Sequence, residues 1–504
     1  MPCYLRKLIT FERLEPYEVK VSSTILRRGR RSNPSFLSDG SQARRNARRA
    51  WQLRNISGNK GNKMRVITLI FSILIFCSVL NGVEKTKKEN IFKMEMNNQN
   101  NLNKFLDANQ FKIKTIDLNE GENSDFHFLK NFIGNSEIVL LGEQDHGDGT
   151  SFIAKAKIIK YLHEEMGFNV LAYESDFYDC NIKGNQFKEK KILIAELKKS
   201  LWSFWSSGKE IQPFYKYLEY QNNSVNPLHI TGFDCQYTNG KKEKKFVDDY
   251  LEFIKNFVFP DKVNSNVQEN FLKIVKEFFS KPYEYKFSNE FKTTFFDIID
   301  NIINIEKSDT SSIDDFFIQE MKNLKGFAEY KWCSENNKHI SRDAQMADNF
   351  KWLFEHKFKG EKIIIWAHNF HTLKNCSYIF SNEVIAECEA EGINLNWIGH
   401  LMGEILYREY TDKIYSIGFI AYNGEYNNKA FQGNFTNTEK IFSEENSLEK
   451  VIHSKQIDYG FINLKDAHIS KFLMSGDCHN EATKSDWKNV FDGLFYIDEM
   501  SGIK

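Results

Sequence analysis

Glutamate and histidine side chains follow short apolar runs at three places in this sequence, and together they suit general acid–base chemistry. Glu143 and His146 follow the first run, Glu174 follows the second, and His368 and His371 follow the third. Histidine has an unperturbed pKa of about 6.5, so its imidazole can accept a proton from water near neutral pH. The residue types therefore favour proton transfer by a histidine.

Each of these residues has an ordinary structural explanation when it is taken alone. A single glutamate after a strand is more often a helix N-cap or a surface group, and a single histidine such as His368 is more often a hydrogen-bonded core residue. Asp234 follows a fourth apolar run, and six titratable residues at such positions favour a site. Three histidines and two glutamates are equally a ligand set for zinc, manganese or iron. A metal-dependent hydrolase therefore stays an alternative.

Other catalytic and metal-binding motifs are missing from the sequence. It contains no Gly-x-Ser-x-Gly elbow, no Walker A motif and no His-Glu-x-x-His motif, which disfavours a covalent serine mechanism. The eight cysteines are scattered without a Cys-x-x-Cys pair, which argues against a disulfide framework and a structural zinc site. Lysine plus arginine equals aspartate plus glutamate at 68 each, so the overall charge does not indicate a nucleic-acid partner.

Strands and helices alternate along most of the chain. Apolar runs of four to five residues without polar alternation predict strands buried on both faces of a parallel sheet. The runs cover Ile138–Leu141, Val170–Tyr173, His229–Phe233 and Ile363–Ala367, and further strands are expected at 414–422, 459–464 and 494–497. The clearest helical pattern spans 151–166, with Thr150 or Ser151 as the expected N-cap. This alternation predicts an α/β sandwich whose ligands bind at the carboxyl ends of the strands.

Residues 242–335 differ from the rest of the chain. They carry long amphipathic helical patterns, such as 246–257 and 267–279, and few strand signals. They are predicted to form a helical insertion over the C-terminal ends of the strands. Their Phe and Tyr residues would suit a large apolar ligand, although such residues more often form core.

The first 110 residues are expected to lie outside the catalytic domain. Arginine is frequent up to Arg65, whereas only Arg342 and Arg408 follow, so residues 1–63 are interpreted as a mis-started or disordered extension rather than a basic arm. Residues 64–82 have the basic start and short apolar stretch of a signal peptide or N-terminal anchor. Export to the periplasm, the envelope or the medium is therefore expected, with a cytoplasmic location if this signal is unused. Residues 83–110 are interpreted as a linker and 111–504 as the catalytic domain.

Several short motifs occur in a fixed order between residues 110 and 500. They are Gly142-Glu143-Gln144-Asp145-His146-Gly147, Gly167-Phe168 with Glu174, Gly232-Phe233-Asp234, Arg342-Asp343-x-x-Met346-Ala-x-Asn349, Trp366-Ala-His368-Asn369-x-His371, Met402-Gly403 and Asp492-Gly493. In order and spacing this set resembles the erythromycin-esterase family, which includes macrolide-inactivating esterases and relatives assigned to polysaccharide biosynthesis.

The resemblance implies a three-layer α/β/α fold with a mainly parallel central sheet, and metal-independent attack of water on a lactone or ester without a cofactor. By motif, the residues that fall on active-site positions are Glu143, His146, Glu174, His368 and His371. Substrate contacts are expected from Lys155, Asp234 and Arg342. Lys155 stands where the family commonly has arginine, and the two are not equivalent at a bidentate site. Arg342 is equally interpreted as a structural ion pair with Asp343 or a neighbouring carboxylate.

The expected function is hydrolysis of a macrolide lactone or a related ester, which would inactivate the antibiotic. In this hypothesis His146 is the general base, held in its tautomer by Glu143 or Glu174. His368 and His371 would bind the carbonyl oxygen or protonate the leaving group, with help from Lys155. The expected partner is a small-molecule ester or lactone, with membrane contact only through residues 64–82. Besides a metal-dependent hydrolase, a haem- or iron-binding relative without activity is the alternative.

Overall fold

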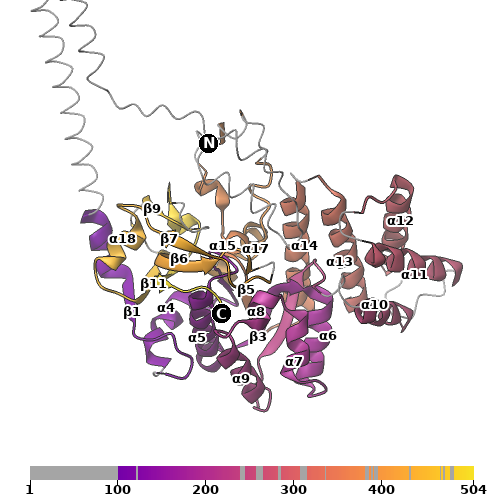
Figure 1. The fold of residues 1–504 in the computed structure, drawn as a ribbon, viewed down its shortest axis with the longest axis horizontal. Helices are drawn as coiled ribbons and strands as arrows, with labels where there is room; N and C mark the ends of the chain where they lie inside the picture. The colour runs from indigo at the N-terminus through magenta and orange to yellow at the C-terminus, as the bar shows by residue number, and fades with distance from the viewer. Residues whose placement is uncertain are drawn as a thin grey trace, which may run out of the picture. The chain divides into compact units, whose positions relative to one another are not determined.

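The central element is a nine-stranded sheet in which six strands run parallel, as predicted (Figure 1). Its order is β1-β8-β11-β6-β2-β5-β3-β4, and β7 pairs with β6. The strands are β1 (Gln110–Ile113), β2 (Ile138–Leu141), β3 (Phe168–Asp176), β4 (His229–Asp234), β5 (Lys362–Trp366), β6 (Ile414–Asn427), β7 (Thr438–Phe442), β8 (Tyr459–Asn463) and β11 (Gly493–Met500). β1, β7 and β8 pair with their neighbours in antiparallel fashion. A separate antiparallel pair consists of β9 (Phe472–Met474) and β10 (Thr483–Ser485).

The computed structural model describes residues 100–504, apart from 121–122, 239–243, 257–264, 282–284, 307–314, 335–336, 381–384, 387–389, 391–394, 431–432, 466, 469–470 and 477–481. The predicted extension 1–63 and signal 64–82 lie outside these residues, as does the linker up to residue 99. Residues 100–109 are helical and bury Leu102, Phe105 and Leu106, so the folded part begins before residue 111. Within the described ranges no helix is long and apolar enough to cross a bilayer.

The predicted strands are confirmed, with one difference that concerns the site. All four residues of β2 are buried because both faces of the sheet are covered by helices. β3 continues past the apolar run to Asp176, so Glu174 lies within the strand and not after it. A register shift between Tyr173 and Asp176 interrupts the pairing of β3 with β4 at this point. Such an irregularity re-aims side chains, and Glu174 lies at it.

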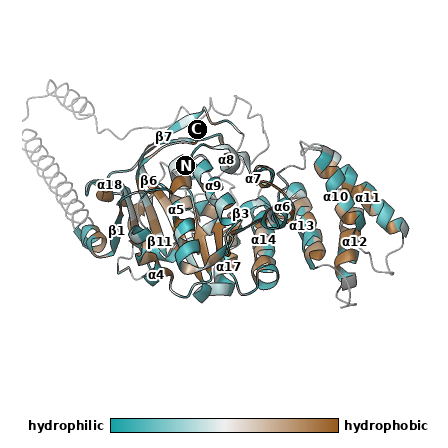
Figure 2. Ribbon diagram, turned by 90° about the horizontal axis from the view of Figure 1, so that it is seen from below, coloured by the Kyte–Doolittle hydropathy of each residue, from teal (hydrophilic) through white to brown (hydrophobic). Residues whose placement is uncertain are grey.

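Helices cover both faces of the sheet and form the predicted three layers (Figure 2). One face packs against α4 (Phe128–Ile133), α5 (Gly149–Met166) and α9 (Gln212–Gln221), and the other packs against α14 (Lys338–Trp352), α17 (Met402–Tyr410) and α18 (Leu448–His453). The predicted N-cap of α5 is wrong. The helix begins at Gly149 and its N-cap position is Asp148, because the loop from β2 is shorter than the apolar pattern suggested.

Among its described residues the predicted insertion contains four helices, which lie beyond α14 in Figure 1. They are α10 (Lys244–Asn256), α11 (Ser265–Ser280), α12 (Asn289–Glu306) and α13 (Asp315–Trp332). α13 packs on α14, while Tyr178 and Tyr237, which follow β3 and β4, contact the ring of Tyr250. The buried aromatic side chains of the insertion pack on one another and form a hydrophobic core.

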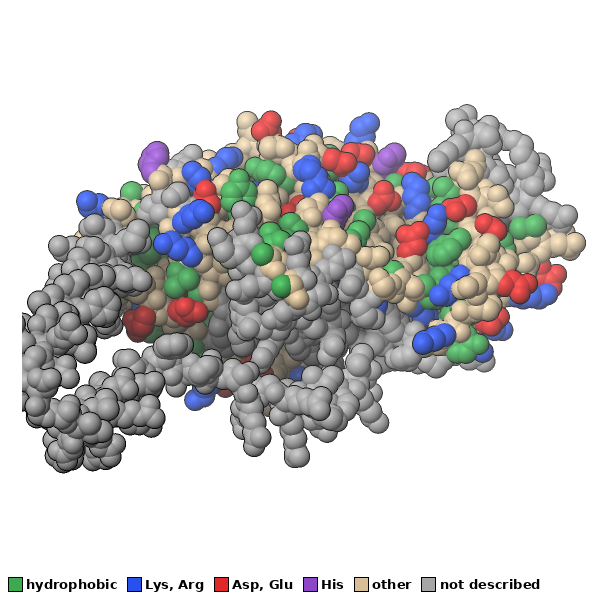
Figure 3. All heavy atoms as spheres, turned by 90° about the horizontal axis from the view of Figure 1, so that it is seen from above, with side chains coloured by type: hydrophobic (Ala, Val, Ile, Leu, Met, Phe, Trp, Pro, Cys, Tyr) green, Lys and Arg blue, Asp and Glu red, His purple; other side chains and the backbone are tan. Residues whose placement is uncertain are grey.

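Charged side chains are mixed over the face shown in Figure 3, where lysine, arginine, aspartate and glutamate alternate among the described residues. This agrees with the equal numbers of basic and acidic residues in the whole sequence.

Candidate active site

The carboxyl ends of four adjacent strands, in the order β2-β5-β3-β4, bring the predicted site residues together. Glu143 and His146 follow β2, His368 and His371 follow β5, Glu174 lies in β3, and Asp234 ends β4. α5 supplies Lys155 and α14 supplies Arg342. Hydrogen bonds link these eight residues into two groups, one centred on Glu143 and the other on Arg342.

Glu143 is completely buried and accepts four hydrogen bonds. Its Oε1 lies 3.0 Å from His146 Nδ1 and 3.1 Å from Trp205 Nε1. Its Oε2 lies 2.6 Å from Lys155 Nζ and 3.0 Å from Trp366 Nε1. A carboxylate has about four acceptor positions, so the side chain is satisfied on both oxygens and held in one orientation.

The Glu143–Lys155 pair is fully buried. Burial alone would raise the pKa of Glu143, but the charge of Lys155 and the bond from His146 outweigh it and hold that pKa below its usual value. For Lys155 burial outweighs its attraction to Glu143 and lowers the pKa to about 8. Lys155 Nζ also lies 3.2 Å from the carbonyl oxygen of Ala367.

His146 is the most exposed of the predicted site residues, with 12% of its side chain accessible. Burial would lower its pKa, but the hydrogen bond to Glu143 and the negative charges around it raise the pKa overall. Because Nδ1 donates to Glu143, Nε2 is the nitrogen left for a reactant. Nε2 has no hydrogen-bond partner among the residues that the structure describes. His146 therefore has the geometry of an oriented base at the boundary of the buried cluster.

The second group is a buried ion cluster around Arg342. Its Nη2 lies 2.8 Å from Glu174 Oε1 and 2.9 Å from Asp234 Oδ2, while its Nε lies 3.1 Å from Asp234 Oδ1. The two bonds to Asp234 form the bidentate geometry that arginine favours with carboxylates. The predicted ion pair of Arg342 with a neighbouring carboxylate is thus present, and its partners are Glu174 and Asp234.

Asp343 binds His371, with Oδ1 at 2.7 Å from Nδ1. Burial lowers the pKa of His371, but the charges of Asp343 and Glu174 outweigh it and raise the pKa to about 9. Its Nε2 lies 3.4 Å from Glu174 Oε1 and 3.3 Å from Arg342 Nη1. His371 is completely buried among these charged groups, and the raised pKa favours its protonated form.

Both ring nitrogens of His368 are engaged. Nε2 lies 2.9 Å from the carbonyl oxygen of Gln144 and must donate to it, while Nδ1 accepts from the backbone N–H of Phe370 at 3.1 Å. Burial keeps the pKa of His368 well below its usual value, which agrees with a neutral ring. Its backbone N–H binds Glu174 Oε2 at 3.0 Å. This arrangement fixes the loop after β5 and gives the imidazole no free nitrogen for proton transfer.

Sequence reasoning missed Phe204, Trp205 and the role of Asp343. Phe204 and Trp205 lie on α8 (Ser203–Ser207), a short helix that follows no strand and carries no motif. Asp343 was visible only as the neighbour of Arg342, and its spacing from His371 in the sequence gave no sign of their contact. An aromatic pair beside serines was the only available signal for α8.

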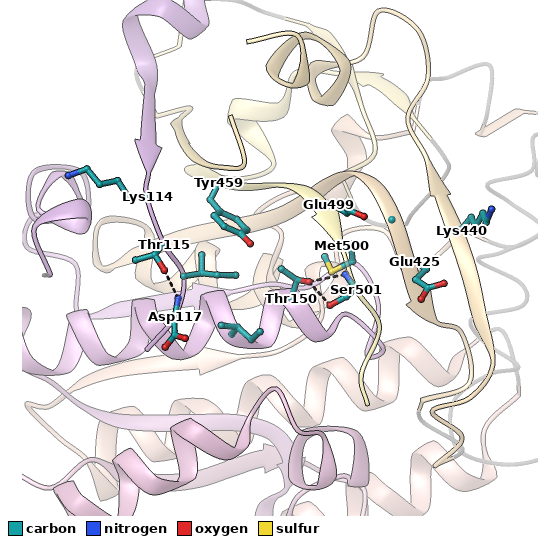
Figure 4. Close-up of a pocket in the computed structure, with 13 residues that line it drawn as sticks. Lys114, Thr115, Asp117, Thr150, Glu425, Lys440, Tyr459, Glu499, Met500 and Ser501 are labelled. Carbon is teal, nitrogen blue, oxygen red and sulfur yellow. Dashed lines mark hydrogen bonds between the residues drawn. The ribbon is translucent and has the colours of Figure 1, made fainter. Parts of the chain in front are cut away.

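No three His, Cys, Asp or Glu side chains are grouped as ligands for a metal ion within the part of the chain that the structure describes. A surface pocket of about 670 Å³ lies near the ends of β6 and β11, away from the predicted site residues. Thr150, Tyr459, Glu499 and Ser501 are among its lining residues (Figure 4).

A family model described as erythromycin esterase matches residues 163–500. The chain belongs to the erythromycin esterase family. Five of the eight predicted site residues fall within the matched stretch, while the segment with Glu143, His146 and Lys155 precedes it. The chain is 28% identical over 336 residues to "Putative hydrolase YbfO" of Bacillus subtilis strain 168, covering 61% of this chain and 70% of that protein.

Solved structures share the fold. A succinoglycan biosynthesis protein has a TM-score of 0.64 at 19% identity, covering 80% of this chain and 98% of its own. A Bacillus cereus protein has a TM-score of 0.62 at 21% identity with the same coverage. A mutant of the erythromycin esterase EreC in its open conformation has a TM-score of 0.56 at 14% identity, covering 78% and 98%. The family and the names of its members indicate a hydrolase, which agrees with the residues of the site.

Proposed function

We propose that this protein hydrolyses an ester or lactone, and that His146 is its general base. The observation that carries the proposal is the position of His146. Its Nδ1 is fixed by Glu143 at 3.0 Å, and its Nε2 faces the boundary of the cluster without a partner among the described residues. The other seven predicted residues are at least 97% buried and bonded to one another or to the backbone.

In the proposed reaction His146 Nε2 accepts a proton from water while the water oxygen bonds to the carbonyl carbon of the substrate. The tetrahedral intermediate then collapses, the bond to the alkoxide oxygen breaks, and the protonated His146 returns the proton to that oxygen. The products are a carboxylic acid and an alcohol, which remain joined when the substrate is a lactone. Glu143 stabilises the imidazolium that forms between the two steps.

The buried residues have positioning roles in this mechanism. Lys155 and Trp366 hold Glu143, while Arg342 and His371 hold Glu174. His368 anchors the loop after β5 to the backbone after β2. Lys155 therefore acts on the substrate through Glu143 and His146.

We propose a macrolide lactone as the substrate, and inactivation of the antibiotic as the result. The proposal rests on membership of the erythromycin esterase family and on the shared fold with EreC. Secretion through residues 64–82, which stays a prediction, would expose the enzyme to the drug outside the cytoplasm.

The test is incubation of erythromycin with the purified protein, followed by mass spectrometry, with and without EDTA. A product heavier than erythromycin by one water in both conditions, and no such product with His146→Gln, would support the proposal. A gain that EDTA abolishes would instead indicate a metal-dependent hydrolase. If neither erythromycin nor a panel of other lactones and esters reacts, the proposed function is wrong.

A further inference from the structure

Phe204 lies against the ring of His146 from outside the predicted motifs. The two rings are stacked, with centroids 4.6 Å apart and planes 16° from parallel. Phe204 is itself buried, and its ring lies edge-on to that of Trp205. A flat aromatic surface at this distance restricts rotation of the imidazole about its bond to Cβ.

Trp205 contacts the same histidine and also its carboxylate partner. Its ring stands edge-on to His146 at 5.5 Å, and its Nε1 donates to Glu143 Oε1 at 3.1 Å. That oxygen also accepts from His146 Nδ1, so the indole and the imidazole share one acceptor. Trp205 is completely buried, and its carbonyl accepts from Tyr215 at 2.6 Å, which holds the helix in place.

Residues 501–504 join α8 to the loop that carries His146. On the loop side, the backbone N–H of Ile503 donates to Gly147, and Ser501 exchanges hydrogen bonds with Thr150 (Figure 4). On the other side, Lys209, two residues after α8, donates its N–H to the carbonyl of Lys504 at 2.9 Å. α8 and the His146 loop are 50 or more residues apart in the sequence, yet a third segment holds both in place.

We propose that Phe204 and Trp205 are positioning residues for His146, and this inference rests on the proposed function of that histidine. Phe204 fixes the plane of the imidazole, and Trp205 fixes the carboxylate oxygen toward which Nδ1 points. Nε2 is thereby aimed at one place before the substrate arrives. Preorganisation of this kind lowers the barrier because the reactive group need not be reoriented.

The first test needs no substrate. The pKa of the His146 imidazole is measured by NMR of protein with labelled histidines, with His146→Gln identifying the signal. In Trp205→Phe a phenyl ring replaces the indole and the indole N–H is lost, so Glu143 Oε1 accepts only from His146. The pKa of His146 should rise, because the carboxylate charge is no longer shared.

The matched control is Trp352→Phe. Trp352 also donates its indole N–H to a carboxylate, Asp315 Oδ2 at 2.9 Å, but it lies on α14 outside the site. The control should leave the pKa of His146 unchanged. An unchanged pKa in Trp205→Phe, or the same change in both variants, would overturn the inference.

The second test uses the rate of hydrolysis. Trp205→Phe should lower kcat about tenfold, the worth of one hydrogen bond, with little change in KM. The acid limb of the pH profile should move to higher pH with the pKa of His146. If Trp205→Phe does not fold, Phe204→Leu takes its place: the inference predicts a lower kcat at unchanged KM, and a wild-type kcat contradicts it. Failure of the wild type to hydrolyse any ester would refute the proposed function, while the NMR titration would still decide the inference.

Discussion

Replacing Glu143 with glutamine should separate the stability of the buried cluster from its chemistry. The glutamine side chain keeps one oxygen, but its NH₂ group faces donors where the carboxylate accepted. Two of the four donors within 3.1 Å would therefore lose their acceptor. Each unsatisfied buried donor costs about 1–3 kcal/mol. Lys155 would remain a buried ammonium without its carboxylate partner, and breaking a buried ion pair from one side costs about 3–5 kcal/mol in total.

We expect Glu143→Gln to lower the free energy of unfolding by that amount at pH 7, measured by urea denaturation. The second variant is Glu143→Gln/Lys155→Met, in which the stranded ammonium is also removed. The methionine would replace an ammonium whose Nζ lies 4.8 and 5.7 Å from the ring centroids of Trp366 and Phe419. The double variant should regain about 2 kcal/mol, because a buried ion pair replaced by apolar groups costs little.

The catalytic activity, unlike the stability, should not recover in the double variant. Without the carboxylate charge, the imidazolium that His146 forms on taking the proton is no longer stabilised, and general-base catalysis contributes about 100-fold or more. Both variants should therefore lose kcat by about 100-fold, although only the single variant is strongly destabilised. A double variant no more stable than the single one would refute the account of the ion pair. Wild-type activity in either variant would refute the role of Glu143.

Three further predictions concern the buried charges. The pKa of His371 is raised to about 9, so its contribution of about 3 kcal/mol is complete below pH 6.5 and lost as the pH rises through 9. Asp343→Asn should accordingly lower the melting temperature at pH 6 much more than at pH 10, as measured by calorimetry. Arg342→Met should cost about 3–5 kcal/mol in urea denaturation because it strands two carboxylates. Burial raises the pKa of Glu320, bonded to two tyrosines, to about 8, so its stabilisation is lost as the pH rises through 8. Thermal melts of Glu320→Gln should fall less between pH 6 and 9 than those of wild type, and an equal fall would contradict this.

The sheet was predictable because its central strands are buried on both faces. Runs such as Ile138–Leu141 and Ile363–Ala367 contain only apolar residues. A short run of this kind is typical of a parallel strand that is covered on both faces. The residues at their ends were also predictable, since parallel strands place their carboxyl ends together. The extension of β3 through Glu174 was not predictable from the local sequence. Its buried carboxylate is stabilised by an ion pair with Arg342 of α14, which lies far along the chain.

The details of the site depend on contacts that no local pattern records. The motif predicted His368 as a reacting group, but the structure binds both its ring nitrogens to the backbone. Trp205 comes from a short helix held by residues near position 504, so only the fold brings it to Glu143. Side-chain types thus predicted where the polar cluster lies, while the hydrogen-bond partners of each histidine required the packing.

The most direct measurement is hydrolysis of erythromycin in water enriched in heavy oxygen, with wild-type protein and His146→Gln compared by mass spectrometry. The account predicts that the wild-type product gains one water carrying the heavy oxygen in its new carboxyl group, and that His146→Gln forms it at least 100-fold more slowly. Equal rates for the two proteins would contradict the assignment of His146 as the general base.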